Sequence, residues 1–188
     1  MSPAAPLMTV EDYFTKTPET VKPMELIHGR LRVAESPTVR HQSAVFQLSL
    51  ALHAHVTERK LGRVWVSPLD VVLSRRDHLI VQPDLFFISN EREGIVERDR
   101  IWGPPDLVIE VLSPDPRIGK TAERVRWFAE YNVRECWLVH QDDRTITVVE
   151  FDGERETARR TFARDEPIVS RVLPELTLRL DDVLLDWK

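Results

Sequence analysis

The fold of this chain is restricted most by two short apolar stretches, each of which carries an acidic residue. The first covers residues 81–88 and contains Asp84, and the second covers residues 106–112 and contains Glu110. Both are rich in branched and aromatic residues, so we expect two buried β-strands. An ionised carboxylate is costly to bury unless it is paired with a cation or bound to a metal ion. The two acids are therefore either structural ion-pair partners or members of a functional site.

The pattern around these strands predicts an α/β fold with a mixed β-sheet flanked by helices. Apolar residues recur every three to four positions over residues 38–60 and 118–131, which predicts two amphipathic helices. Residues 24–33 predict two strands about a turn at Gly29, where glycine permits a positive φ. Further strands are expected over residues 64–67, 69–74, 135–140, 144–150, 156–162 and 176–180.

Shorter features complete the prediction. Thr9 and Asp12 fit the two ends of a capping box that starts a short N-terminal helix. Gly62 is expected to end the long helix, and residues 181–184 to add a last helical turn. Residues 89–105 are charged and irregular, and we expect them to form a loop or short helix over the two acids. No G-x-G-x-x-G or phosphate-loop sequence supports a nucleotide-binding fold.

The composition is that of a soluble globular protein, with 42% hydrophobic and 30% charged residues among 188. We expect one domain over residues 1–188, with a loose N-terminal tail at about residues 1–8. No apolar run approaches the roughly 18 to 20 residues of a membrane span, and no secretory signal pattern begins the chain. The single Cys136 excludes an intrachain disulfide and a cysteine zinc cluster. This cysteine usage predicts a cytoplasmic location.

The balance of acidic and basic residues indicates which binding partners the chain favours. A net charge of -5 does not favour bulk binding to nucleic acid, although a protein that grips phosphate needs only local positive charge. Of the 26 basic residues, 21 are arginines. A catalytic lysine therefore has few candidates, which are Lys16, Lys22, Lys60, Lys120 and Lys188.

Asp84 and Glu110 can meet at one end of a sheet if their strands are neighbours. Two carboxylates from different strands suit a hard divalent cation such as Mg²⁺, for which Mn²⁺ is a substitute. A nearby ammonium group could orient the attacking water or stabilise developing negative charge. Lys120, ten residues after Glu110, is the candidate for this group. From the residues alone, two structural acids in ion pairs stay an equal alternative.

Short motifs occur in a specific order over most of the chain. They are Glu25-Leu26-Ile27-His28-Gly29, Ser36-Pro37 to His41, Pro68-Leu69-Asp70-Val71, Gln82-Pro83-Asp84, residues 105–114 and residues 133–139. This ordered set resembles the Uma-two family of endonucleases, a branch of the PD-(D/E)XK nuclease superfamily. The resemblance implies a restriction-endonuclease-like fold and a Mg²⁺-dependent endonuclease that hydrolyses phosphodiester bonds in DNA.

The resemblance also implies roles for particular residues. In that superfamily the acid of the Pro-Asp pair and the acid of the later strand hold the metal, and these roles fall to Asp84 and Glu110. The lysine that usually lies two residues after the second acid is replaced by Leu112. In this branch the lysine lies on the following helix, at the position of Arg124, with Lys120 one turn earlier on the same face. Lys120 and Arg124 stay alternatives, although Arg124 is too basic to take a proton.

Three further positions are assigned by the same resemblance. Glu25 precedes the Leu-Ile-x-Gly turn as the family's early glutamate does, which implies an assisting role with a metal contact; a solvated acid at the end of a strand is the alternative. His41 matches a recurrent family histidine, for which a substrate contact and packing at the helix end are alternatives. Phe128 stands where tyrosine is usual. Together with Arg124, this departure keeps open a catalytically impaired nucleic-acid-binding or assembly module on the same fold.

DNA is the expected partner, a membrane is not, and a homodimer is possible because nucleases that cut duplexes often pair two sites. A glycosidase is a weaker alternative, since it needs two acids about 5 to 9.5 Å apart across a sugar cleft. Sugar clefts usually offer aromatic platforms. The tryptophans here, by contrast, mostly fit core patterns: Trp65, Trp102, Trp127, Trp137 and Trp187.

Overall fold

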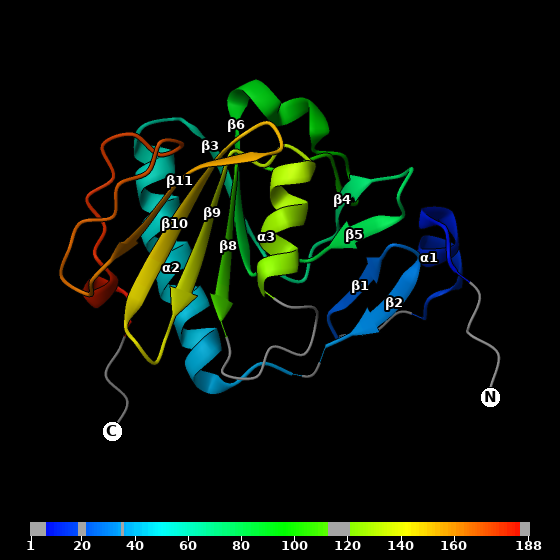
Figure 1. The fold of residues 1–188 in the computed structure, drawn as a ribbon, viewed down its shortest axis with the longest axis horizontal. Helices are drawn as coiled ribbons and strands as arrows, with labels where there is room; N and C mark the ends of the chain where they lie inside the picture. Colours follow the sequence, from blue (N-terminus) through cyan, green and yellow to red (C-terminus); the bar gives the residue numbers. More distant parts are fainter. Residues whose placement is uncertain (1–6, 19–21, 35, 113–120, 185–188) are drawn as a thin grey trace.

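A computed structural model describes residues 7–18, 22–34, 36–112 and 121–184. In these ranges the chain forms two mixed β-sheets with helices packed against them (Figure 1). The prediction of a mixed sheet flanked by helices is confirmed, with two sheets in place of the one expected. Within the same ranges, no helix has the length and apolar character that crossing a membrane requires.

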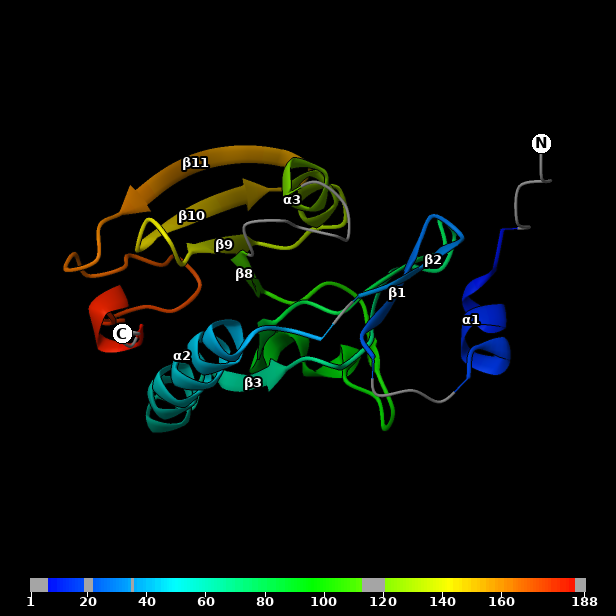
Figure 2. The ribbon, with the colours of Figure 1, turned by 90° about the horizontal axis from the view of Figure 1, so that it is seen from below.

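The larger sheet has six strands in the order β11-β10-β9-β8-β6-β3. β8 and β9 run parallel, and all other neighbours run antiparallel. Helix α2 (Val39–Glu58) covers one face of this sheet and helix α3 (Thr121–Glu130) the other (Figures 1 and 2). The strands are β3 (Gly62–Val66), β6 (Leu85–Ser89), β8 (Leu107–Leu112), β9 (Glu135–His140), β10 (Thr145–Asp152) and β11 (Arg155–Phe162).

Strand β8 shows how the sheet places its acid. Side chains alternate between the two faces of a strand. Ile109 and Val111 pack into the core beneath α2, whereas Val108 packs with Phe128 of α3. Glu110 therefore points to the face that α3 covers, as the hydrogen bonds described below show.

The smaller sheet has five strands in the order β2-β1-β5-β4-β7. They are β1 (Met24–Ile27), β2 (Arg30–Val33), β4 (Val71–Ser74), β5 (Leu79–Val81) and β7 (Ile101–Trp102). Helix α1 (Val10–Lys16) packs on this sheet, and Thr9 and Asp12 form the predicted capping box at its start. Figure 2 shows α1 and α2 at opposite ends of the molecule.

The single strand predicted over residues 81–88 is wrong. The chain leaves the small sheet after β5, passes through Gln82-Pro83-Asp84, and enters the large sheet as β6. Pro83 has no backbone N–H and cannot continue a ladder, so the break falls at this residue. Asp84 thus lies at the junction of the two sheets, where its carbonyl oxygen accepts a hydrogen bond of 3.0 Å from the backbone N–H of Ser67.

Gly62 does not end the long helix as predicted. α2 ends at Glu58, and Lys60 takes a positive φ of 53°. Gly62 is the first residue of β3, where an added Cβ would lie 2.1 Å from the carbonyl oxygen of Ile88. Glycine is needed there because the backbones of β3 and β6 approach each other closely.

Two further expectations differ from the structure. The helical part of residues 89–105 is the 3-10 helix η1 (Asn90–Ile95), which follows the end of β6 opposite to Asp84, so it does not cover the acids. Residues 176–180 form no strand, because only an isolated bridge joins Arg179 to Pro167. The predicted last turn is the short 3-10 helix η2 (Leu180–Asp182).

Candidate functional site

Five of the predicted site residues come together where the two sheets meet. Glu25 comes from β1, Asp84 from the junction before β6, Glu110 from β8, Arg124 from α3 and His41 from the first turn of α2. In Figure 1 this is the region where β1, the end of β8 and the start of α3 converge. The sixth predicted residue, Lys120, lies outside the described residues.

Arg124 links the two sheets through two carboxylates. Its Nη1 donates to both oxygens of Glu25, at 3.0 and 2.8 Å, and its Nη2 and Nε donate to Oε1 of Glu110, at 2.6 and 3.1 Å. The side chains of Arg124, Glu25 and Glu110 are only 11%, 3% and 13% exposed. Burial alone would lower the pKa of the Arg124 guanidinium, but the two carboxylates raise it. Arg124 is therefore a fixed positive charge.

Asp84 is oriented by two groups on one of its oxygens. The backbone N–H of Val111 donates to Oδ2 at 2.8 Å, and Nε2 of His41 lies 3.2 Å from the same atom. His41 is held in place by the N-cap of α2, where Thr38 Oγ1 accepts a hydrogen bond from its backbone N–H. Burial alone would lower the pKa of His41, but the contact with Asp84 and the charge of Glu110 raise it.

The site concentrates negative charge. Burial raises the pKa of the Glu110 carboxyl; the Arg124 guanidinium opposes this shift and the Asp84 carboxylate adds to it. The group contains three carboxyl groups, from Glu25, Asp84 and Glu110, and one guanidinium, from Arg124. With all three carboxyls ionised and His41 neutral, the formal charge of the group is -2 (three negative charges and one positive). A divalent cation would neutralise it.

The donor atoms also fit such a cation. The contacts of Glu110 fall on Oε1 and those of Asp84 on Oδ2, so Oε2 and Oδ1 have no hydrogen-bond partner among the residues that the structure describes. Two hard oxygen ligands, completed by water and phosphate oxygens, are what Mg²⁺ usually takes from a protein. Groups of three or more His, Cys, Asp or Glu side chains able to hold a metal do not occur in the described ranges, so a zinc-type site is not formed there.

Sequence reasoning missed the residues that hold Glu25 in place. The backbone N–H of Gln82 donates to Oε1 of Glu25 at 2.8 Å. The Gln82 side-chain amide donates to Oδ1 of Asp70 at 2.9 Å, and the Tyr13 hydroxyl donates to the same oxygen at 3.1 Å. Gln82 and Asp70 stand inside two of the motifs quoted above, directly before Pro-Asp and directly before β4. The signal in the sequence that could have identified Gln82 and Asp70 is a polar residue at the end of a predicted strand.

Phe128 has a structural role beside the site. The residue is fully buried, and its ring centre lies 5.7 Å from Cζ of Arg124. A guanidinium near an aromatic ring gains a cation–π contact. Phe128 thus packs against the same side chain that binds Glu25 and Glu110.

A further buried acid lies at the other end of β8 and has a different environment. The Asp106 side chain is 1% exposed, with Oδ1 at 3.0 Å from Arg134 and 3.4 Å from Arg92. Its Oδ2 accepts a hydrogen bond of 2.7 Å from the backbone N–H of Ser89. Paired in this way, Asp106 is a structural acid.

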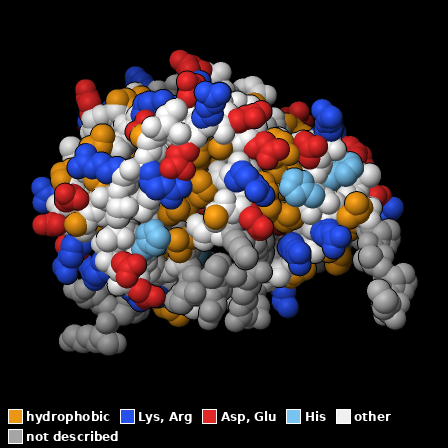
Figure 3. Space-filling model, in the orientation of Figure 1, with side chains coloured by type: hydrophobic (Ala, Val, Ile, Leu, Met, Phe, Trp, Pro, Cys, Tyr) orange, Lys and Arg blue, Asp and Glu red, His pale blue; other side chains and the backbone are white. Residues whose placement is uncertain are grey.

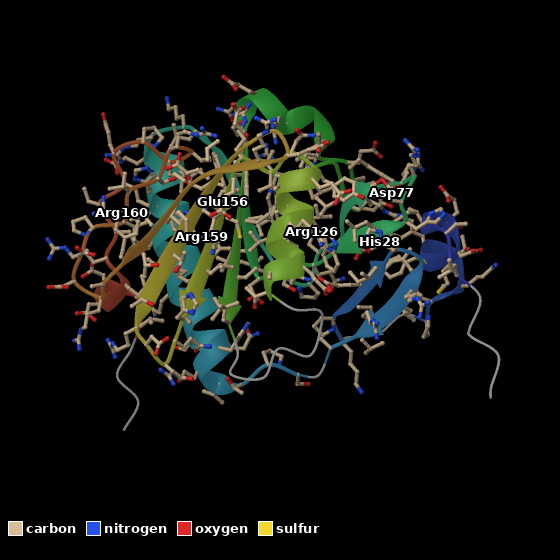
Figure 4. The ribbon with its side chains drawn as sticks, viewed as in Figure 1. His28, Asp77, Arg126, Glu156, Arg159 and Arg160 are labelled. Carbon is tan, nitrogen blue, oxygen red and sulfur yellow. The ribbon has the colours of Figure 1, made fainter. Side chains whose placement is uncertain are left out.

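A groove of about 650 Å³ opens on the other side of α3, between that helix and β10–β11. Apolar side chains form its floor (Figure 3). Arg126 stands on α3 on one side, and Glu156 and Arg159 stand on β11 on the other (Figure 4). Glu156 and Arg159 pair at 2.8 Å, so these two charges compensate each other within the groove.

Comparison with known proteins supports this assignment of the fold. The model of the Uma2 family, described as "putative restriction endonuclease", matches residues 10–181. A solved structure of "a putative nuclease belonging to DUF820" from Anabaena variabilis has a TM-score of 0.75 and 22% identity, covering 92% of this chain and 96% of that chain. At this identity the structural likeness shows the fold alone. No curated protein matches the sequence significantly.

Proposed function

The chain belongs to the Uma2 family, and from the geometry of its site we propose that it is a metal-dependent endonuclease that hydrolyses phosphodiester bonds in DNA. One observation carries the proposal. Asp84, from the segment before β6, and Glu110, from β8, reach the same junction, and each keeps one carboxylate oxygen without a hydrogen-bond partner in the described part of the chain. The family description supports the nuclease class, and the metal and the DNA substrate are our proposal.

Asp84 and Glu110 would hold the ion, which we propose to be Mg²⁺ or Mn²⁺. A divalent ion there would act as a Lewis acid on the scissile phosphate and lower the pKa of a bound water. The carboxylates supply the negative charge and the hard oxygens that such an ion requires.

Arg124 would stabilise the negative charge that develops on the phosphate. Its guanidinium is always charged and cannot take a proton from water. Proton transfer therefore needs another group, and Lys120 stays the candidate from the sequence, in the part of the chain that the structure does not describe.

Glu25 and His41 would act as positioning residues. Both oxygens of Glu25 accept hydrogen bonds from Arg124, so we propose that Glu25 fixes this guanidinium and is not a primary metal ligand. His41 fixes the Asp84 carboxylate through Oδ2. A ligand held in one orientation before the ion binds does not have to be ordered on binding.

Cleavage of supercoiled plasmid in Mg²⁺ or Mn²⁺ tests the proposal. We expect Asp84→Asn and Glu110→Gln each to slow nicking by at least about 100-fold, as removal of a group that stabilises the transition state does. The matched control is Glu156→Gln, an acid in the groove on the other side of α3, which should cleave at the wild-type rate. Circular dichroism establishes that each variant is folded. Wild-type cleavage by both site variants would contradict the proposal.

A second candidate is a catalytically silent nucleic-acid-binding or assembly module. The ion pairs that Arg124 makes with Glu25 and Glu110, at the position where the family places lysine, favour it. Calorimetric titration separates the two candidates. Binding of duplex DNA without binding of Mg²⁺ or Mn²⁺ supports the silent module, whereas ion binding that is lost in Asp84→Asn and Glu110→Gln supports the nuclease.

A further inference from the structure

The outward face of α2 carries large apolar side chains that no described element covers. Val39 is 73% exposed, Phe46 is 58% exposed and Leu50 is 50% exposed. At 3.6 residues per turn these three side chains lie along one line of the helix. Figure 2 shows α2 beside the edge strand β3 on the outside of the molecule. The outward face of a solvated helix normally carries charged and polar residues.

The same helix also lacks charged residues between its two ends. Residues 41–57 contain no Asp, Glu, Lys or Arg, and no other stretch of the chain is as long without one, although 30% of all residues are charged. The centre of a protein–protein interface is depleted in charged residues and enriched in side chains such as Phe. Exposed apolar side chains without intervening charges therefore mark α2 as an interaction surface.

We propose that this face is the interface of a homodimer in which two α2 helices pack antiparallel. The centre line of the face holds Val39, Phe46, Leu50 and Thr57, which are placed symmetrically about position 48. An isologous interface has two-fold symmetry: if one residue contacts a second residue of the partner, then that second residue contacts the first residue of the partner. An antiparallel pair centred on position 48 thus places Phe46 against the partner's Leu50, twice.

The flanks of the centre line match in the same arrangement. At 100° per residue, Gln42 and His53 lie on one side of the line, and Ser43 and Ala54 lie on the other. The two-fold axis places Gln42 next to the partner's His53, where their polar groups can form hydrogen bonds. It places Ser43 next to the partner's Ala54, and small residues allow the two helices to approach closely.

A second copy fits this face better than a charged partner does. An identical surface meets itself without like-charge repulsion when it carries no charge, and antiparallel helices also oppose their dipoles favourably. An anionic or cationic partner would find no charge to pair with along residues 41–57. A helix that lies on a membrane surface is typically flanked by Lys and Arg on its polar face, which this stretch does not contain. The inference does not depend on nuclease activity.

Sedimentation equilibrium tests the proposal on the full chain. One chain has a mass of 21.9 kDa, so the wild type should sediment at about 44 kDa, which is twice that value. Phe46→Glu and Leu50→Glu should each weaken association by at least tenfold and give monomers at micromolar concentration. Val169→Glu is the matched control, because Val169 is 58% exposed like Phe46 but lies outside α2, and it should stay dimeric. Circular dichroism confirms that each variant is folded.

Paired charges test the register. Gln42→Glu with His53→Glu brings like charges together across the two-fold axis and should dissociate the dimer. Gln42→Glu with His53→Lys brings opposite charges together and should keep it. A wild type that is monomeric at micromolar concentration, a dimer that persists in Phe46→Glu, or equal association of the two double variants would each overturn the proposal. Binding of monomeric wild type to phosphatidylcholine vesicles through Phe46 would overturn it as well.

Discussion

At the scale of single residues, Arg124 determines what the site can do. It holds Glu25 of the small sheet and Glu110 of the large sheet at distances of 2.6 to 3.1 Å, with all three side chains nearly buried. A lysine at this position would offer a single compact charge and could exchange a proton, whereas the guanidinium forms a fixed fork. Arg124 therefore has a structural function as well as the electrostatic one proposed above.

We expect Arg124→Ala to lower the free energy of unfolding by about 3 kcal/mol, because it leaves two buried carboxylates without their cation. Arg126→Ala is the control on the same helix. Arg126 is exposed and has no ion pair among the described residues, so its loss should cost less than about 0.5 kcal/mol. Urea unfolding measures both values. Equal, small effects would show that the ion pairs of Arg124 contribute little to stability.

At the scale of elements, local sequence patterns predict the helices, turns and helix caps, because these depend on residues that are close together in the sequence. The apolar periodicity of α2 and α3, the Gly29 turn and the Thr9–Asp12 capping box are all confirmed. The break within residues 81–88 could not be predicted as easily. It arises because β5 pairs with β1 and with its sequence neighbour β4 in one sheet, while β6 pairs with β3 and β8 in the other. Apart from β4, none of these partners is adjacent in the sequence to the strand that it pairs with.

The short element η2 allows a test of pH dependence. Its Asp181 accepts hydrogen bonds of 2.9 Å from Arg164 and 3.0 Å from Arg144, and these bonds hold the pKa of Asp181 below its usual value of 3.8. A carboxyl with a lowered folded-state pKa stabilises the fold above its unfolded pKa, and this contribution is lost as the pH falls through the folded pKa.

The melting temperature of Asp181→Asn should therefore lie below that of the wild type at pH 7, and the difference should shrink as the pH falls below about 4. Scanning calorimetry at several pH values measures it. Asp165→Asn is the control, because Asp165 is exposed and makes no ion pair within the described ranges. A difference for Asp181→Asn that is the same at every pH would contradict this role of the ion pairs.

At the scale of the whole molecule, the site exists because two sheets meet. The small sheet supplies Glu25, the large sheet supplies Glu110, and Asp84 lies on the segment that joins them. From the residues alone, structural ion pairs and a functional site are equal alternatives for Asp84 and Glu110. The family motifs select these two acids and Glu25 as site residues. Neither the residues alone nor the motifs predicted that Arg124 would span Glu25 and Glu110, since that contact depends on the angle at which the sheets come together.

The central claim is that Asp84 and Glu110 hold one divalent ion at this junction. Anomalous diffraction from a crystal soaked in Mn²⁺ tests it most directly, because it locates the ion whether or not DNA is cleaved. We expect one anomalous peak in contact with both carboxylates in the wild type, and no peak there in Asp84→Asn. A wild-type crystal with no Mn²⁺ at Asp84 and Glu110, or with its ion bound only at other carboxylates, would contradict the claim.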